Sequence, residues 1–279
     1  MIAAILLATA LAVPTAPADT IVDMRRGDHV VIANLSGELI VEGWDRDALE
    51  IFAEDGDARL RVTRSGPAVR VGPDGGRRRR SSDARIMIPA WADLEIEGVS
   101  LDITIRGVGG ALNVGNVSGD IVIRDIGGRV EARSIDGEIH VEDARAGVHA
   151  SSQSDDVVLR RVTGPVEVHS GDGDVLLDDV TSESVRAETQ DGDIVFSGSI
   201  ADGGDYGFFL HDGDAMIAVP ASASARVSVS TFDGEFESEF PVVVQRFTGG
   251  REFDFVLGDG GARLRIEAFD GEIRLIRRR

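Results

Sequence analysis

Apolar and polar positions alternate in short stretches along this chain, and from about residue 94 to residue 276 the pattern recurs about every 18 residues. Each repeat begins with two apolar positions separated by one residue, as in Ile121-Val122-Ile123 and Ile139-His140-Val141. A second such pair follows, as in Val130-Glu131-Ala132. Alternation with a period of two is typical of a strand that buries one face, so each repeat is predicted to contain two strands.

The apolar positions keep their place from one repeat to the next. The first two series are Ile103, Ile121, Ile139, Val157, Val175 and Ile194, and Ile105, Ile123, Val141, Leu159, Leu177 and Phe196. Most of these residues are β-branched, as strands prefer. No window of useful length has the period of a helix.

A short acidic phrase marks one turn of each repeat, as in Ser118-Gly119-Asp120 and Asp136-Gly137-Glu138. Its central positions 119, 137, 155 and 173 are 18 residues apart, and the later steps are 19, 21, 21 and 37 residues. We interpret the last step as close to two periods. Ser36-Gly37-Glu38 is interpreted as an isolated early copy. Gly and Asp suit such turns because both tolerate a positive φ angle.

One strand–turn–strand–turn unit cannot bury its own apolar face, whereas a stack of such units can. The sequence therefore predicts an all-β, β-helix-like solenoid built from two-strand repeats of about 18 residues. The alternative is a stacked β-hairpin sandwich. The constant register of the apolar series favours the solenoid.

The chain divides into four predicted segments. Residues 1–18 read as a signal peptide, because the apolar run Met1 to Val13 precedes a small-x-small cleavage site at Ala16-Pro17-Ala18. Residues 19–72 form an N-terminal β segment, and residues 73–84 a flexible, Arg-rich loop. Residues 85–279 form the solenoid, continuous with the N-terminal segment. We therefore expect export to the periplasm, the outer surface or the medium, with no membrane span after cleavage.

The composition narrows the choice of partners. The net charge of -20 repels phosphate backbones, so nucleic acid is excluded as a partner. The chain has no Cys, and therefore no disulfide, no thiolate metal site and no cysteine nucleophile. Partners are expected to be a cell-envelope component or a surface ligand, either protein or glycan.

These features together resemble the bacterial putative adhesin family, a β-strand-repeat domain of unknown function. The resemblance lies in the stretch from Ile32 to Asp45, in Ile88-Pro89 before Leu94-Glu95-Ile96, in the unit from Ser118 to Gly128, and in the closing turns around Gly258 to Ala262. It implies export and a β-helix-like fold, and it supplies no catalytic residues.

The turn acids are the candidate metal ligands. Stacked coils would bring like charges together, and a bound divalent cation would relieve their repulsion, with oxygen ligands suited to Ca²⁺. The candidate residues are Asp120, Glu138, Asp156, Asp172, Asp174, Asp191 and Asp193. The simpler interpretation, which we favour, is that these acids serve turns on a solvated edge. No other cofactor is expected.

A second candidate site is the run Arg77, Arg78, Arg79 and Arg80, which could contact an anionic surface. A solvated loop is the simpler interpretation. No Gly-x-Ser-x-Gly or His-Glu-x-x-His motif is present, and the aromatic residues considered as a sugar platform are Trp44, Trp91, Tyr206 and Phe208-Phe209.

We therefore predict a non-enzymatic, exported envelope or surface protein with an adhesin-like or scaffold binding role. One alternative is an accessory or sensor partner in the envelope-stress response. The other is a glycan-active β-helix enzyme that uses carboxylates of one face.

Overall fold

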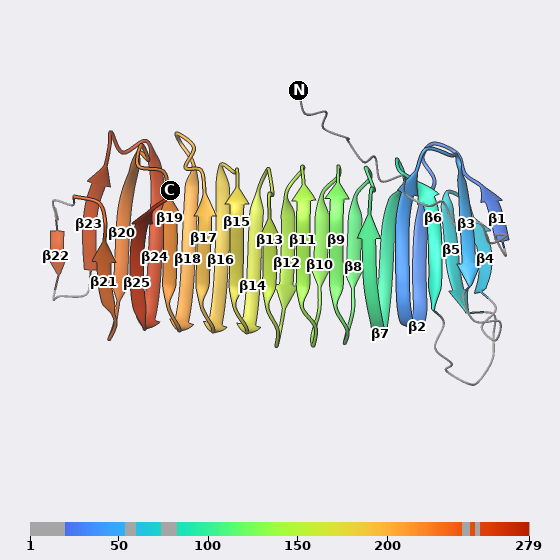
Figure 1. The fold of residues 1–279 in the computed structure, drawn as a ribbon, viewed down its shortest axis with the longest axis horizontal. Coiled ribbons are helices and arrows are strands. Elements are labelled where there is room, and N and C mark those ends of the chain that lie inside the picture. Colours follow the sequence, from blue (N-terminus) through green and yellow to red (C-terminus); the bar gives the residue numbers. More distant parts are fainter. Residues whose placement is uncertain (1–19, 54–59, 74–82, 242–245, 249–251, 279) are drawn as a thin grey trace, which may run out of the picture.

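The structure is a computed structural model that describes residues 20–53, 60–73, 83–241, 246–248 and 252–278. In these ranges the chain forms β-strands arranged side by side in a long rod (Figure 1), and no helix there could cross a membrane. Along the middle of the rod each strand pairs in parallel with the strand two places further along the chain. Parallel pairing between successive coils confirms the predicted β-solenoid over the hairpin sandwich, whose strands would pair antiparallel.

Each coil contributes one strand to each of two faces that enclose the core. The first face contains, in spatial order, β4 (Leu60–Ser65), β5 (Ala68–Pro73), the first halves of β2 (His29–Trp44) and β7 (Asp93–Arg106), β8 (Leu112–Gly115), β10 (Val130–Arg133), β12 (Val148–Ser152), β14 (Val166–Asp172), β16 (Ser184–Asp191), β18 (Asp205–Asp212), β24 (Ala262–Asp270), β20 (Ala225–Thr231), β23 (Glu252–Leu257) and β22 (Arg246–Thr248).

The second face is built in the same way. It contains β1 (Thr20–Asp23), β3 (Ala48–Ala53), β6 (Ala84–Pro89), the second halves of β2 and β7, β9 (Ile121–Ile126), β11 (Ile139–Ala144), β13 (Val157–Arg160), β15 (Val175–Val180), β17 (Ile194–Gly198), β19 (Ala215–Val219), β25 (Glu272–Arg277) and β21 (Glu235–Ser238). The long strands β2 and β7 pass through a corner and join the two faces.

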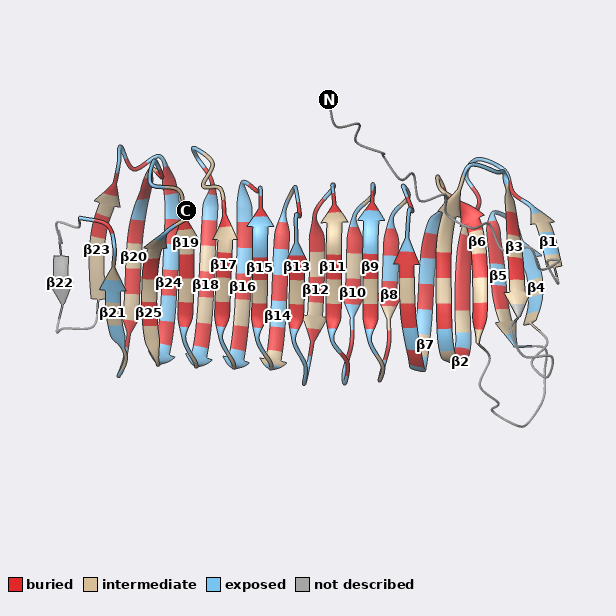
Figure 2. Ribbon diagram, viewed as in Figure 1, coloured by how far each residue is buried: buried red, intermediate tan, exposed pale blue. Residues whose placement is uncertain are grey.

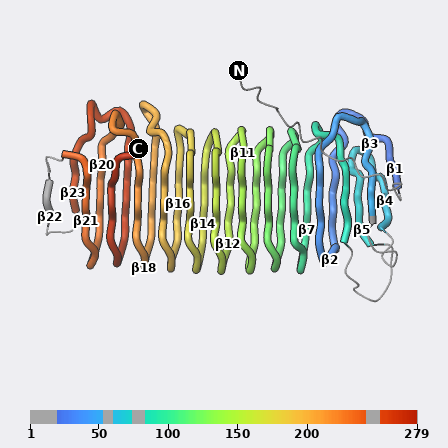
Figure 3. Tube along the Cα trace, in the orientation of Figure 1, coloured from blue at the N-terminus to red at the C-terminus, as the bar shows by residue number. Residues whose placement is uncertain are grey.

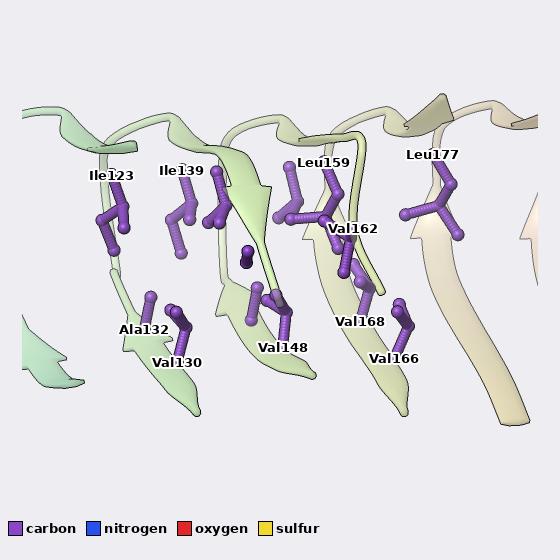
Figure 4. Packing of buried hydrophobic residues seen from close by; sticks show 14 of the residues in the cluster. Ile123, Val130, Ala132, Ile139, Val148, Leu159, Val162, Val166, Val168 and Leu177 are labelled. Carbon is purple, nitrogen blue, oxygen red and sulfur yellow. The ribbon is translucent and has the colours of Figure 1, made fainter. Parts of the chain in front are cut away.

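The core is a set of columns in which equivalent apolar side chains lie on top of one another. Ile121, Ile139, Val157 and Val175 are direct strand partners, and each is fully buried. Figure 4 shows apolar side chains from neighbouring coils gathered in one interior, and Figure 2 shows buried residues recurring along every central strand. The predicted columns are confirmed, because every coil places its alternate residues inward.

At both ends of the rod the spatial order of the coils departs from the chain order. The chain goes from β18–β19 to the outer coil β20–β21, and then returns to fill the gap between them with β24–β25 (Figure 3). At the other end, β2 lies between the outer coil β5–β6 and β7.

This order corrects two interpretations of the acidic phrase. The step of 37 residues is not two periods, because Asp270 pairs directly with Asp212 and the copy at Asp233 lies outside both. The early copy is not isolated, because Ser36 pairs with Ser100 in the adjacent strand. Identical phrases can stack in any order, so sequence spacing alone could not fix which copies are neighbours.

The second corner of the coil uses residues in the left-handed region. Asp125, Asp143, Arg161 and Asp179 occupy equivalent positions with φ between 51° and 59°. Asp tolerates this conformation, whereas Arg rarely adopts it. Arg161 is held there by Asp143, which accepts hydrogen bonds from Nε at 2.8 Å and from Nη2 at 2.9 Å. The Arg161 guanidinium lowers the pKa of the Asp143 carboxyl.

The structure describes some of the predicted segments fully and others only in part or not at all. The signal sequence 1–18 lies outside them, as does most of the loop 73–84. Residues from the N-terminal segment 19–72 stack directly on the repeats, since β2 pairs with β7 over most of its length. The two parts share one core.

Candidate functional site

The predicted acidic edge runs along the corner where the Asp-Gly turns stack. All of its residues are exposed: Asp120, Glu138, Asp156, Asp172, Asp174, Asp191 and Asp193. The structure brings them together as two parallel files with one acid per coil in each, and Asp172 is the direct partner of Asp191. The acids therefore lie where the sequence predicted.

One of these files is a ladder of side-chain-to-backbone hydrogen bonds. The Oδ1 atoms of Asp156, Asp174 and Asp193 each accept the backbone N–H of the acid in the next coil, at 2.8 Å. Asp120 accepts the N–H of Glu138 in the same way at 3.1 Å. An ionised carboxylate is a strong acceptor, so each acid satisfies a backbone donor that the turn would otherwise leave free.

Within the described residues, no group of three or more His, Asp or Glu side chains is arranged to hold a metal ion. No preformed ligand cluster among these residues therefore supports the predicted Ca²⁺ edge, which stays a prediction. The run Arg77 to Arg80 lies outside the described residues, so the structure does not place this second candidate.

Directly beneath the acids lies a buried polar file that the sequence analysis did not recognise. Ser152, Ser170 and Thr189 are 0–4% exposed, and each hydroxyl donates to a turn carbonyl of the preceding coil. Asn116 is also buried and its amide donates to three carbonyls around the same turn. Buried polar groups that are hydrogen-bonded in this way fix the turns, so the surface above them is preorganised.

Beside the acids, one file of side chains carries most of the exposed apolar surface. We call it the corner row, and it contains in spatial order Val99, Val117, Ile135, Gln153, Gly171, Gln190, His211, Phe269 and Phe232. Among the described residues, six large apolar side chains are exposed, and five of them belong to the corner row. The sixth, Ile21, lies on β1 at the end of the rod. Such clustering is typical of a binding surface rather than of a general solvated face.

The aromatic end of the corner row is a stack of rings from three coils. Phe269 lies between the other two rings, with its centroid 4.8 Å from that of Phe232 and 4.7 Å from that of His211. The two phenyl planes are 7° apart. Phe232 is 54% exposed and Phe269 is 46% exposed.

The corner row borders two hollows on the first face, which we call the corner groove. The aromatic hollow has a volume of about 680 Å³, and the hollow beside Val117 and Ile135, which has a mostly polar lining, about 660 Å³. Both are lined by His169 and Gln190, so they follow one another along the rod. From β7 to β20 the groove spans eight strand intervals, which is about 40 Å at about 4.8 Å each.

Polar side chains complete the aromatic hollow. Glu188, Glu252 and Glu267 line it together with Thr231 and Ser230. Acceptors and donors beside exposed rings can bind sugar hydroxyls while the rings contact the apolar faces of the sugar. Three carboxylates disfavour an anionic ligand at this position.

Of the aromatic residues considered from the sequence, Phe209 lines the aromatic hollow, and the others do not. Tyr206 and Phe208 are buried in the core, and Trp44 and Trp91 lie at the opposite end of the chain. Phe232 and Phe269 were overlooked, although a signal was present. Both stand two residues before the central position of the acidic phrase, as do Ile135 and Val117.

Part of the chain matches a known protein family, and three solved structures are similar to the chain. Residues 160–276 match the family described as Toastrack DUF4097, which confirms the predicted resemblance to an adhesin-like β-repeat family of unknown function. No curated protein matches the sequence.

Three solved structures are similar to this chain. One is a putative cell adhesion protein from Clostridium sporogenes, with 9% identity, a TM-score of 0.24, and coverage of 93% of this chain and 98% of that chain. A putative adhesin from Parabacteroides merdae has 9% identity, a TM-score of 0.39, and coverage of 92% and 95%. A putative adhesin from Bacteroides fragilis has 13% identity, a TM-score of 0.36, and coverage of 93% and 99%.

Proposed function

We propose that this Toastrack-type β-solenoid is an exported, non-enzymatic protein of the cell envelope that holds an extended, neutral glycan along its corner groove. The role is adhesin-like: the rod presents a long binding surface and does no chemistry on what it binds. The observation that carries the proposal is the concentration of exposed rings and aliphatic side chains in one file that runs along the rod.

Three features favour a glycan over other ligands. The groove is open and long, which suits a polymer more than a compact metabolite. Its lining combines the exposed faces of Phe232 and Phe269 with hydrogen-bonding side chains such as Gln190. Its carboxylates oppose anionic polymers, in keeping with the net charge of -20.

A neutral-polysaccharide binding assay compares the intact chain with the Phe232→Ala/Phe269→Ala double variant. We expect the double variant to bind about 5- to 150-fold more weakly, since each ring contributes about 0.5–1.5 kcal/mol of contact. Ile21→Ala is the matched control, because it removes an exposed apolar side chain outside the groove. Its affinity should equal that of the unmodified chain.

Two results would contradict the proposal. If the double variant binds as tightly as the Ile21→Ala control, the corner row is not the binding surface. If the polysaccharide is cleaved and new reducing ends accumulate, the protein is an enzyme and not a passive adhesin.

A further inference from the structure

A third hollow on the first face has the opposite charge to the rest of the molecule. It lies next to the corner groove, has a volume of about 550 Å³, and is lined by strands β16, β18, β24, β20 and β23. Four arginines surround it: Arg186, Arg226, Arg263 and Arg265. Two carboxylates share the lining, Asp205 and Asp254. In a chain with a net charge of -20, this is a local excess of positive charge.

A single glycine creates the hollow. Gly207 pairs on one side with Arg186 and on the other with Arg265, so a position without a side chain lies between two long ones. A Cβ atom at Gly207 would lie 2.6 Å from Cε2 of Phe209, whose ring covers the glycine. We call this hollow the arginine notch. Phe209 lines both the notch and the aromatic hollow of the corner groove.

Neighbouring groups hold several of the guanidinium groups in place. The Arg186 guanidinium lies over the Phe209 ring, 4.4 Å from its centroid, and also pairs with Glu188 on its own strand. Arg265 pairs in the same way with Glu267, at 3.7 Å between Nε and Oε1. Glu188 and Glu267 line the corner groove and not the notch. Their negative charges therefore lie on the groove side of Arg186 and Arg265.

The other two arginines are partners in adjacent strands. Arg263 pairs in register with Arg226 and lies 3.8 Å from the carboxylate of Asp205, in a contact that is largely exposed. Among the residues that the structure describes, Arg226 has no ion-pair partner. Two like charges on adjacent strands repel each other unless an anion lies between or beside them.

We propose that the arginine notch is a binding site for an oxyanion, either a carboxylate or a phosphate group. Arginine suits this role because its planar guanidinium donates two parallel hydrogen bonds to such groups. The notch is open enough for the anion to be a substituent on a larger molecule, such as a uronic acid in a polysaccharide. The proposal does not depend on glycan binding in the corner groove, which has its own rings and carboxylates.

The test is an NMR titration of the full chain that follows the Gly207 amide and the arginine Nε–Hε signals. The probes are a trimer of galacturonic acid, inorganic phosphate and, as an uncharged control, maltotriose. We expect saturable shifts at Gly207 and the four notch arginines with the two anions. The tighter-binding anion then identifies the natural group as a carboxylate or a phosphate. Shifts at the notch with maltotriose but with neither anion would overturn the proposal.

Substitutions distinguish a specific anion-binding site from nonspecific attraction between the anion and positively charged side chains. Arg226→Gln and Arg265→Gln should each lower the affinity for the anion about tenfold, the loss of one charge-assisted hydrogen bond. Gly207→Ala should also lower it without changing the charge, because the added Cβ atom would lie 2.6 Å from Cε2 of Phe209 and would displace the ring over which the Arg186 guanidinium lies. The matched control is Arg274→Gln on β25 of the second face, since Arg274 pairs with Glu272 on its own strand just as Arg265 pairs with Glu267.

Each outcome decides the proposal. Loss of affinity in the notch variants, with the Arg274→Gln protein unchanged, supports it. An equal loss in Arg274→Gln and Arg226→Gln would show nonspecific charge attraction and would overturn it, as would the absence of saturable shifts with both anions. Loss of neutral-glycan binding in the corner groove variants would leave this result unaffected.

Discussion

At the scale of single residues, the acids of the turns serve the backbone of the next coil. Asp174 shows this most clearly: its Oδ1 atom accepts the N–H of Asp193, and its own N–H donates to Asp156. Glu138 occupies the same position in its coil, but no corresponding bond to Asp156 is formed among the described contacts. The shorter side chain of Asp is therefore the one that fits this position.

We expect Asp174→Ala to lower the free energy of unfolding by about 1 kcal/mol, because it removes one hydrogen-bond acceptor from the ladder. Asp174→Asn keeps an Oδ1 acceptor and removes a charge between two other acids, so it should change stability by less than about 0.5 kcal/mol. Urea denaturation in the presence of a chelator measures both values. Equal destabilisation by the two variants would show that the charge matters, and not the acceptor.

The same experiment in millimolar Ca²⁺ tests the predicted calcium edge. If the acids only serve the turns, Ca²⁺ leaves all three unfolding curves unchanged. A stabilisation of the unmodified chain that is lost in Asp174→Asn would instead assign these carboxylates to a bound cation.

At the scale of the strand, position within the coil decides what a residue does. Ile139 on β11 is fully buried between Ile121 and Val157, whereas Val122 on β9 points outward. We expect Ile139→Ala to destabilise the protein by about 2–5 kcal/mol, because it opens a cavity in a continuous column. Val122→Ala, the control, should cost less than about 1 kcal/mol. Thermal unfolding followed by circular dichroism compares them, and equal effects would contradict the buried column.

The strands show what sequence can and cannot predict here. The column through Ile139 and Val157 was predictable, because its members recur at one offset and are apolar throughout. The placement of β24–β25 between β18–β19 and β20–β21 was not, because the phrases at Asp212, Asp233 and Asp270 are equivalent.

The candidate site depends on that unpredictable order. Phe232 and Phe269 are 37 residues apart, and this spacing does not indicate that they lie on adjacent coils. The arginine notch has the same origin, since it needs Gly207 of β18 beside Arg265 of β24. Long-range pairings of this kind are set by the path of the whole chain rather than by local pattern.

At the scale of the whole molecule, the proposed binding surface extends along the rod. The fixed turns and the buried polar file beneath them make one corner rigid. The corner row extends along this corner for about 40 Å, with exposed aliphatic side chains at one end, exposed rings at the other, and Gln153, Gly171 and Gln190 between them. A ligand that fills only one hollow would use part of this surface. We therefore propose that successive coils bind successive parts of one extended molecule.

The most direct test measures the affinity of the unmodified chain for a series of neutral oligosaccharides of increasing length, by isothermal titration calorimetry. We expect the affinity to rise with each added sugar until the ligand reaches from Phe232 to Ile135, and then to level off. We also expect a weaker rise in the Phe232→Ala/Phe269→Ala variant. A disaccharide that binds as tightly as the longest oligomer, or no binding at any length, would contradict it.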